Sequence, residues 1–168
     1  PLNWGLGHAA RCVPIIFFLL ENNFTPVLAS DGKALAFLQQ ELPELESIEL
    51  PSYGISYAKN LKTSLFLQSP KIYKAVQKEK KAIEKYITKD KTVVGIISDN
   101  RFGVRSDKIP SVYITHQVQV LSGLTTVISS KIHQFIINTF DECWIPDFND
   151  QRLSGKLSNP KNLTIPYK

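Results

Sequence analysis

The stretch TVVGIIS, residues 92–98, decides the fold class. It is a continuous apolar run, and such runs are typical of strands in parallel sheets that are covered on both faces. The runs SVYIT at Ser111–Thr115 and ECWI at Glu142–Ile145 predict two further strands, and the residues between them predict a helix over Ser129–Thr139. Strands that alternate with helices predict parallel pairing through right-handed crossovers.

The same alternation extends toward the amino terminus. Apolar spacing and turn residues predict two more helices and two more strands, at His8–Asn22, Thr25–Ala29, Gly32–Glu41 and Glu46–Leu50. An irregular stretch follows over Pro51–Ser69, and a helix that opens at Pro70 is predicted to run to about Thr88. We therefore expect an α/β domain with a doubly wound, mostly parallel, Rossmann-like sheet.

Composition is that of a globular chain. Of 168 residues, 43% are hydrophobic and 21% charged, which is enough to bury a core within one domain. The longest apolar run, Val13–Leu20, is too short to span a membrane and follows no signal-peptide n-region, so we expect a cytoplasmic protein. Cys12 and Cys143 lack metal-ligand spacing and are expected to be buried free thiols.

Two features bear on domain organisation. The chain opens at Pro1 without the strand that should lead into the turn after Asn3, so we expect the first strand to be missing. After Pro146 the sequence becomes polar and rich in turn formers. We therefore expect a domain at 1–146 and a linker at 147–168 that leads toward a further, absent domain.

Polar residues cluster at the predicted carboxyl ends of strands, where open parallel sheets bind ligands. The clusters are Asn3–His8, Ser98–Arg101 and Thr115–Gln117. In the first, two glycines directly before a helix allow backbone N–H groups to approach an anionic or polyhydroxylated ligand. A dinucleotide fingerprint stays open, because Ala10 can take the place of its third glycine and Asp31 could bind a ribose.

The motif GLGHAAR at residues 5–11, together with SDNRFGVRS at 98–106 and IPSVYITHQ at 109–117, resembles GT-B-fold glycosyltransferases. The similarity is to the branch related to the lipid II-forming N-acetylglucosaminyltransferase, and within it to bacterial predicted glycosyltransferases. The resemblance implies the amino-terminal, acceptor-binding half of an inverting enzyme that moves a sugar from a nucleotide-sugar to a hydroxyl acceptor. It also implies that a donor domain follows Lys168 and that the amino-terminal half alone is inactive. No metal or cofactor is implied.

The resemblance makes His8 the candidate general base, and histidine suits this task because its ordinary pKa lies close to neutral pH. Asp99 at a strand end could orient His8 or accept the acceptor hydroxyl, and Arg101 could pair with a phosphate. His133, in the middle of a predicted helix, is expected to be structural. The expected acceptor-binding residues are Asn3, Gly5, Gly7, Arg11, Asn100, Arg101 and His116.

Region 51–89 combines apolar residues with a lysine-rich helix, which contributes to the net charge of +5. Such a surface can rest on an anionic membrane, so we expect a peripheral position on the inner membrane face and a lipid-linked acceptor. No nucleic-acid partner is expected, because no recognition motif is present. Two alternatives stay open: a nucleotide-sugar epimerase or nicotinamide-dependent enzyme on a related fold, and a non-catalytic membrane-surface binding module.

Overall fold

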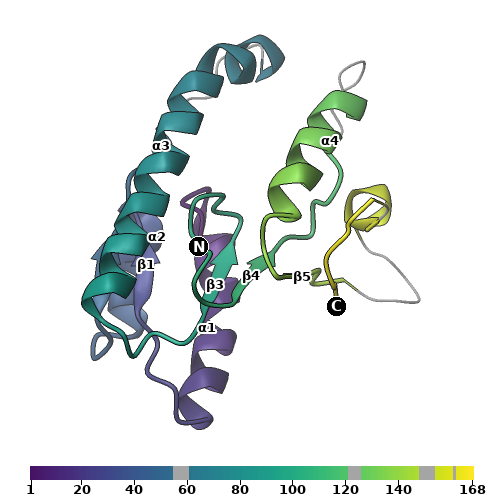
Figure 1. Ribbon diagram of the computed structural model, residues 1–168. Helices are drawn as coiled ribbons and strands as arrows, with labels where there is room; N and C mark the ends of the chain where they lie inside the picture. The colour runs from purple at the N-terminus through teal and green to yellow at the C-terminus, as the bar shows by residue number, and fades with distance from the viewer. Residues whose placement is uncertain (55–60, 121–125, 148–153, 161) are drawn as a thin grey trace.

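The structure is a computed structural model of residues 1–168, and it describes all of them except 55–60, 121–125, 148–153 and 161. The described residues form four α-helices and two small parallel sheets that alternate along the chain (Figure 1). In chain order the elements are α1 (Leu6–Glu21), β1 (Leu28–Ser30), α2 (Gly32–Glu41), β2 (Ser47–Glu49), α3 (Leu61–Lys89), β3 (Ile96–Asp99), β4 (Ser111–Ile114), α4 (Thr126–Ile137), β5 (Glu142–Trp144) and a 3-10 helix (Gly155–Ser158).

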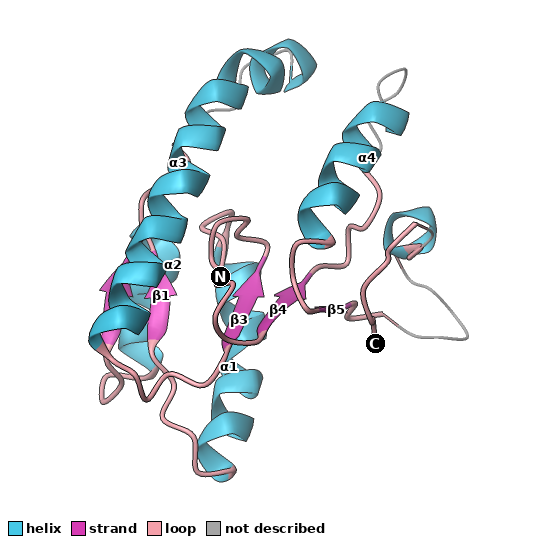
Figure 2. Cartoon of the chain, viewed as in Figure 1, coloured by secondary structure: helices cyan, strands magenta, loops and turns pink. Residues whose placement is uncertain are grey.

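The predicted α/β alternation and parallel pairing are confirmed. β1 pairs with β2, with Ala29 opposite Ile48, and β3, β4 and β5 form the second sheet in that order. In the second sheet Tyr113 lies opposite both Ser98 and Cys143. The arrows of β1 and β3 point in the same direction in Figure 2, so their carboxyl ends lie at the same end of the molecule.

The strands are divided between two sheets, whereas the sequence predicts one. The first two residues of the chain contact both sheets: Ser30 Oγ donates to the Pro1 carbonyl at 2.8 Å, and the Leu2 N–H donates to the Asp99 carbonyl at 2.9 Å. Figure 1 accordingly places the amino terminus between β1 and β3. The residues that lead into α1 therefore lie between β1 and β3, the neighbouring edge strands of the two sheets.

Apolar side chains pack in separate clusters around the two sheets. One joins α1, β1 and α2 through Ala9, Cys12, Ile16, Leu28, Ala34, Leu38 and Leu42. Another surrounds β4 and β5 through Tyr113, Val118, Ile137, Phe140 and Cys143. The prediction of buried free thiols is confirmed, since Cys12 and Cys143 are both buried and free. Burial raises the pKa of Cys12 to about 11 and that of Cys143 to about 12.

Helix α3 is longer than the sequence predicts. It begins at Leu61, so Pro70 lies inside the helix, and the predicted irregular stretch over Pro51–Ser69 is wrong for its second half. The physical reason is that proline removes one backbone hydrogen bond without forbidding helix on both sides, while 61–68 is rich in the helix formers leucine, lysine and glutamine. Residues 55–60 of that stretch lie outside the described residues.

The carboxyl end of the segment predicted as a linker packs against the second sheet. Tyr167 forms a parallel bridge with Cys143, whose N–H donates to the Pro166 carbonyl at 2.9 Å. Leu163 and Ile165 pack against the cluster around Tyr113. Because these two apolar residues are two positions apart, an extended chain turns both toward the same face.

None of the helices in the described part of the chain is both long enough and apolar enough to cross a membrane.

Candidate functional site

The candidate site forms where β3 ends and α1 begins. Asp99 is the last residue of β3, and the glycine turn leads directly into α1 at Leu6. His8 and Arg11 are three residues apart in α1, so both lie on the helix face that meets Asp99. The topology thus brings residues about 90 positions apart in the sequence into hydrogen-bonding distance.

The glycine turn is open to solvent. Gly5 has φ 79°, a left-handed conformation in which a side chain would be strained, and it precedes the first helical residue without offering a capping side chain. A Cβ added at Gly5 or at Gly7 would meet no described atom within 4 Å. Gly5 therefore provides no side-chain cap for the first N–H groups of α1, and the surface around the turn is uncrowded.

Asp99 is the centre of the site. Its carboxylate accepts from His8 Nδ1 at 2.8 Å, from Arg11 Nε at 2.9 Å and Nη2 at 2.5 Å, and from Asn100 Nδ2 at 3.2 Å. The Asp99 side chain is 1% exposed, while those of His8 and Arg11 are 16% and 24% exposed. Although burial favours the neutral carboxyl, the hydrogen bonds from His8 and Arg11 lower the pKa of Asp99 overall. The site therefore holds a buried, ionised carboxylate behind a partly exposed imidazole.

This carboxylate decides which nitrogen of His8 carries the proton. An ionised carboxylate can only accept, so its 2.8 Å contact with Nδ1 requires a proton on that nitrogen. Arg11 Nη2 also lies 3.0 Å from His8 Nδ1, but it donates to Asp99 Oδ1 at a shorter distance. The polar contacts of the His8 ring with described residues all involve Nδ1, and with the proton on that nitrogen the hydrogen bond is the one to Asp99. Nε2 is therefore the nitrogen left to accept a proton from a ligand.

His116 and Asn100 complete the cluster. Arg11 Nη1 donates to His116 Nδ1 at 3.3 Å, and burial together with the charge of Arg11 lowers the pKa of His116, which keeps its imidazole neutral. Asn100 has φ 55°, an uncommon value for a residue other than glycine, and its Oδ1 accepts from the Tyr113 hydroxyl at 3.3 Å. These bonds fix the Asn100 amide beside Asp99.

Arg101 belongs to a different cluster. Its guanidinium is 1% exposed and donates to Glu79, to Asp31 and, at 2.8 Å, to the Pro51 carbonyl. Although burial opposes its charge, Glu79 and Asp31 raise the pKa of Arg101. The guanidinium expected to pair with a phosphate is thus enclosed by the protein's own carboxylates, and we leave it out of the site.

Asn3 lies at the edge of the Arg101 cluster rather than beside Asp99. Asn3 Nδ2 donates to Asp31 Oδ2 at 3.3 Å, and Asn3 Oδ1 accepts from the Ala34 N–H. A cavity of about 140 Å³ adjoins it, lined by Leu2, Asn3, Trp4, Asp31, Ser52, Tyr53 and Gly54. Asn3 therefore connects the glycine turn with this cavity.

The sequence interpretation missed Glu79 and Tyr53. Glu79 is fully buried and accepts from the Tyr53 hydroxyl at 2.6 Å and from the Gly103 N–H at 3.0 Å. A signal for Glu79 was present: it lies four residues before Ile83 and three after Val76, on the apolar face of its helix. A carboxylate at such a position predicts a buried cationic partner. Tyr53 had no comparable signal.

His133 is buried in α4, with its ring edge-on to Phe102 at a centroid distance of 5.6 Å. Burial lowers its pKa to about 4.

Among the residues that the structure describes, no group of three or more histidine, cysteine, aspartate or glutamate side chains could hold a metal ion. No protein-family model, curated protein or solved structure matches the chain.

Proposed function

We propose that the chain is the acceptor-binding half of an inverting, GT-B-fold glycosyltransferase, a bacterial hexosyltransferase in which His8 is the general base. The single observation that carries the proposal is the hydrogen bond from His8 Nδ1 to the buried, ionised Asp99, which leaves Nε2 as the basic nitrogen. A carboxylate behind an imidazole fixes its tautomer and stabilises the imidazolium that forms on proton uptake. Asp99 is then the orienting partner of the base.

In the proposed step, His8 Nε2 removes the proton from an acceptor hydroxyl while the hydroxyl oxygen attacks the anomeric carbon of a nucleotide-sugar. The bond from that carbon to the leaving nucleoside diphosphate breaks as the new glycosidic bond forms, so the configuration inverts. Arg11 holds Asp99 in place through two hydrogen bonds and supplies positive charge beside the site. The nucleotide-sugar would be held mainly by a second domain, and this half alone would be inactive.

The surroundings of Asp31 favour this proposal over a dinucleotide-dependent enzyme. Alternating helices and parallel strands fit both classes of enzyme and do not distinguish them. Asp31, the acid that a dinucleotide fold would direct at a ribose, is 5% exposed and already bonded to Arg101 and Asn3. A nicotinamide-dependent enzyme or an epimerase would need this carboxylate free.

A lipid-linked acceptor on the inner, cytoplasmic membrane face is part of the proposal and rests on sequence pattern. Region 51–89 includes residues 55–60, which lie outside the described residues. Over the described part of α3 the lysines at 71, 74, 78, 81, 85 and 89 are exposed, as such a contact requires.

The test uses the complete protein with both halves and a panel of nucleotide-sugars. We expect His8→Ala to lower kcat by about 100- to 10,000-fold, the usual contribution of a general base, without weakening nucleotide-sugar binding. Asp99→Asn should also lower kcat, because an amide no longer favours the proton on His8 Nδ1. Lys131→Ala, on the exposed face of α4, is the control and should leave kcat unchanged. Unchanged turnover in His8→Ala would remove His8 from this role.

A further inference from the structure

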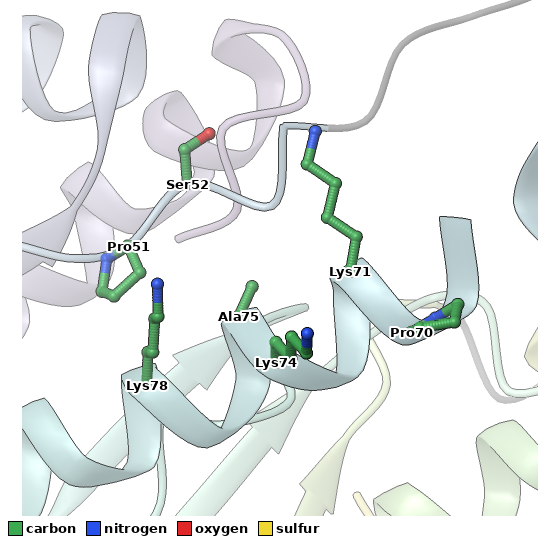
Figure 3. A pocket seen from close by; sticks show the side chains of 7 residues that line it. All are labelled: Pro51, Ser52, Pro70, Lys71, Lys74, Ala75 and Lys78. Carbon is green, nitrogen blue, oxygen red and sulfur yellow. The ribbon is translucent and has the colours of Figure 1, made fainter. Parts of the chain in front are cut away.

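A second cavity, with a volume of about 610 Å³, lies between α3 and the chain that follows β2 (Figure 3). Three lysines line it, and the other lining residues carry no charge. The full lining is Pro51, Ser52, Pro70, Lys71, Lys74, Ala75 and Lys78. The three lysines are three and four residues apart, so they lie on one face of α3. Figure 3 shows the side chain of Lys78 extending from α3 toward Pro51 and that of Lys71 extending toward the chain beyond Ser52.

The charges of these lysines are not balanced by the described part of the protein. No ion pair between described residues includes Lys71, Lys74 or Lys78, and no carboxylate lines the cavity. Lys71 Nζ donates to the Gly54 carbonyl at 2.9 Å, which uses one of its three hydrogens. Like charges at these spacings repel one another, so the arrangement of the three lysines is unfavourable without an anion in the cavity.

The same helix neutralises charge elsewhere. Lys80 pairs with Asp107 at 2.7 Å, and Glu84 pairs with Lys108 at 2.9 Å. Lys81 and Lys85 form no ion pair among the described residues either, but they lie outside the cavity, so what distinguishes Lys71, Lys74 and Lys78 is that they line a hollow with no carboxylate in it. A hydroxyl is also present there, since Ser52 lines the cavity.

We propose that this cavity binds a phosphate-bearing ligand through Lys71, Lys74 and Lys78. Lysine ammonium groups bind phosphate as point charges, and three of them match the two to three negative charges of a diphosphate. The volume lies within the range of small-molecule sites. Ser52 lines this cavity and also the smaller cavity beside Asn3, so a ligand held by the lysines can extend toward the glycine turn. The proposal does not depend on the transferase reaction.

The test compares two double variants of the chain with equal loss of charge. Lys74→Gln with Lys78→Gln removes two lysines of the cavity. Lys81→Gln with Lys85→Gln, the control, removes two exposed lysines of α3 that do not line it. The soluble probe is inorganic pyrophosphate, titrated by calorimetry at low ionic strength, where charged contacts are least screened. A second arm measures sedimentation with phosphatidylcholine vesicles, with and without phosphatidylglycerol.

We expect the cavity variant to lose at least about tenfold in pyrophosphate affinity, and the control variant to bind pyrophosphate as the parent chain does, because one lost charged contact is already worth about that factor. In the vesicle arm the cavity variant should lose more affinity than the control, since Lys81 and Lys85 belong to the surface proposed to rest on the membrane. Loss in the pyrophosphate arm identifies a soluble phosphate ligand, and loss in the vesicle arm alone identifies a lipid headgroup. Equal losses in both double variants would show unspecific attraction to a basic helix and would overturn the proposal. Binding unaffected by either variant, or absent in both arms, would overturn it as well.

Discussion

Replacing Arg101 by methionine tests whether a buried charge cluster holds the two sheets together. Arg101 follows β3, and its guanidinium donates to Asp31 at the end of β1, to Glu79 of α3 and to the carbonyl of Pro51 after β2. It is among the largest fully buried side chains. Methionine keeps an unbranched side chain of similar reach but removes the charge and all five donors.

The expected cost follows from what the substitution leaves behind. Glu79 is 0% and Asp31 5% exposed, so both carboxylates would stay buried without their cation. Removing one partner of a buried ion pair costs about 3–5 kcal/mol. Glu79 keeps the Tyr53 hydroxyl and the Gly103 N–H, which keeps the loss within that range. Against a total stability of roughly 5–15 kcal/mol for a domain, this is a large fraction.

The pH dependence gives the prediction a second, independent readout. Burial already raises the pKa of Glu79, although Arg101 and Tyr53 oppose the shift. Without Arg101 this pKa rises further, so the folded variant binds a proton that the unfolded chain does not yet bind. The destabilisation should therefore shrink as the pH falls from neutral toward the ordinary pKa of glutamate.

Urea unfolding of the chain at neutral and mildly acidic pH measures both quantities, with the m-value as a check that unfolding stays two-state. Adding Glu79→Gln to the variant should restore part of the lost stability, because the second substitution removes one of the two stranded charges. A loss below about 1 kcal/mol at neutral pH, or a loss that grows on acidification, would refute the reasoning.

Two further predictions concern buried titratable groups. Burial holds the pKa of His133 at about 4, so the folded chain should lose up to about 3 kcal/mol as the pH falls from about 6.5 to 4, and His133→Phe should flatten that part of the stability profile. A variant profile as steep as that of the parent chain would assign the slope to other groups. The raised pKa values of Cys12 and Cys143 predict that neither thiol reacts with a disulfide reagent at neutral pH until the chain is denatured, as absorbance of the released thiolate would report. Rapid reaction of the native chain would contradict their burial.

The alternation of elements could be predicted from the sequence because apolar runs mark which segments are covered. The predicted bounds of the helix at Gly32–Glu41 agree with α2. The division into two sheets could not be predicted, because periodicity shows that a segment is extended but not which strand lies beside it. The start of α3 was missed for a different reason, since Pro70 suggested a boundary that the backbone does not have.

Part of the candidate site follows from position alone. His8, Arg11, Asp99, Asn100 and His116 meet because parallel strands end at one edge of their sheet and α1 begins at the same end. Sequence position does not separate these residues from Arg101, which is adjacent to Asn100. The alternation of side chains along β3 stops at Asn100, whose φ of 55° lies outside the strand region, and no sequence rule gives the direction of the next side chain.

This adjacency affects how mutations at the site must be interpreted. Asp99, Asn100 and Arg101 are consecutive, yet the first two face His8 and the third anchors β3 to Asp31 and Glu79. Because Arg101 fixes the peptide that positions Asp99, its replacement should lower any activity of the site without removing a ligand contact. Loss of activity in an Arg101 variant is therefore evidence of ligand binding only where the free energy of unfolding is unchanged, and the buried cluster predicts that it will not be.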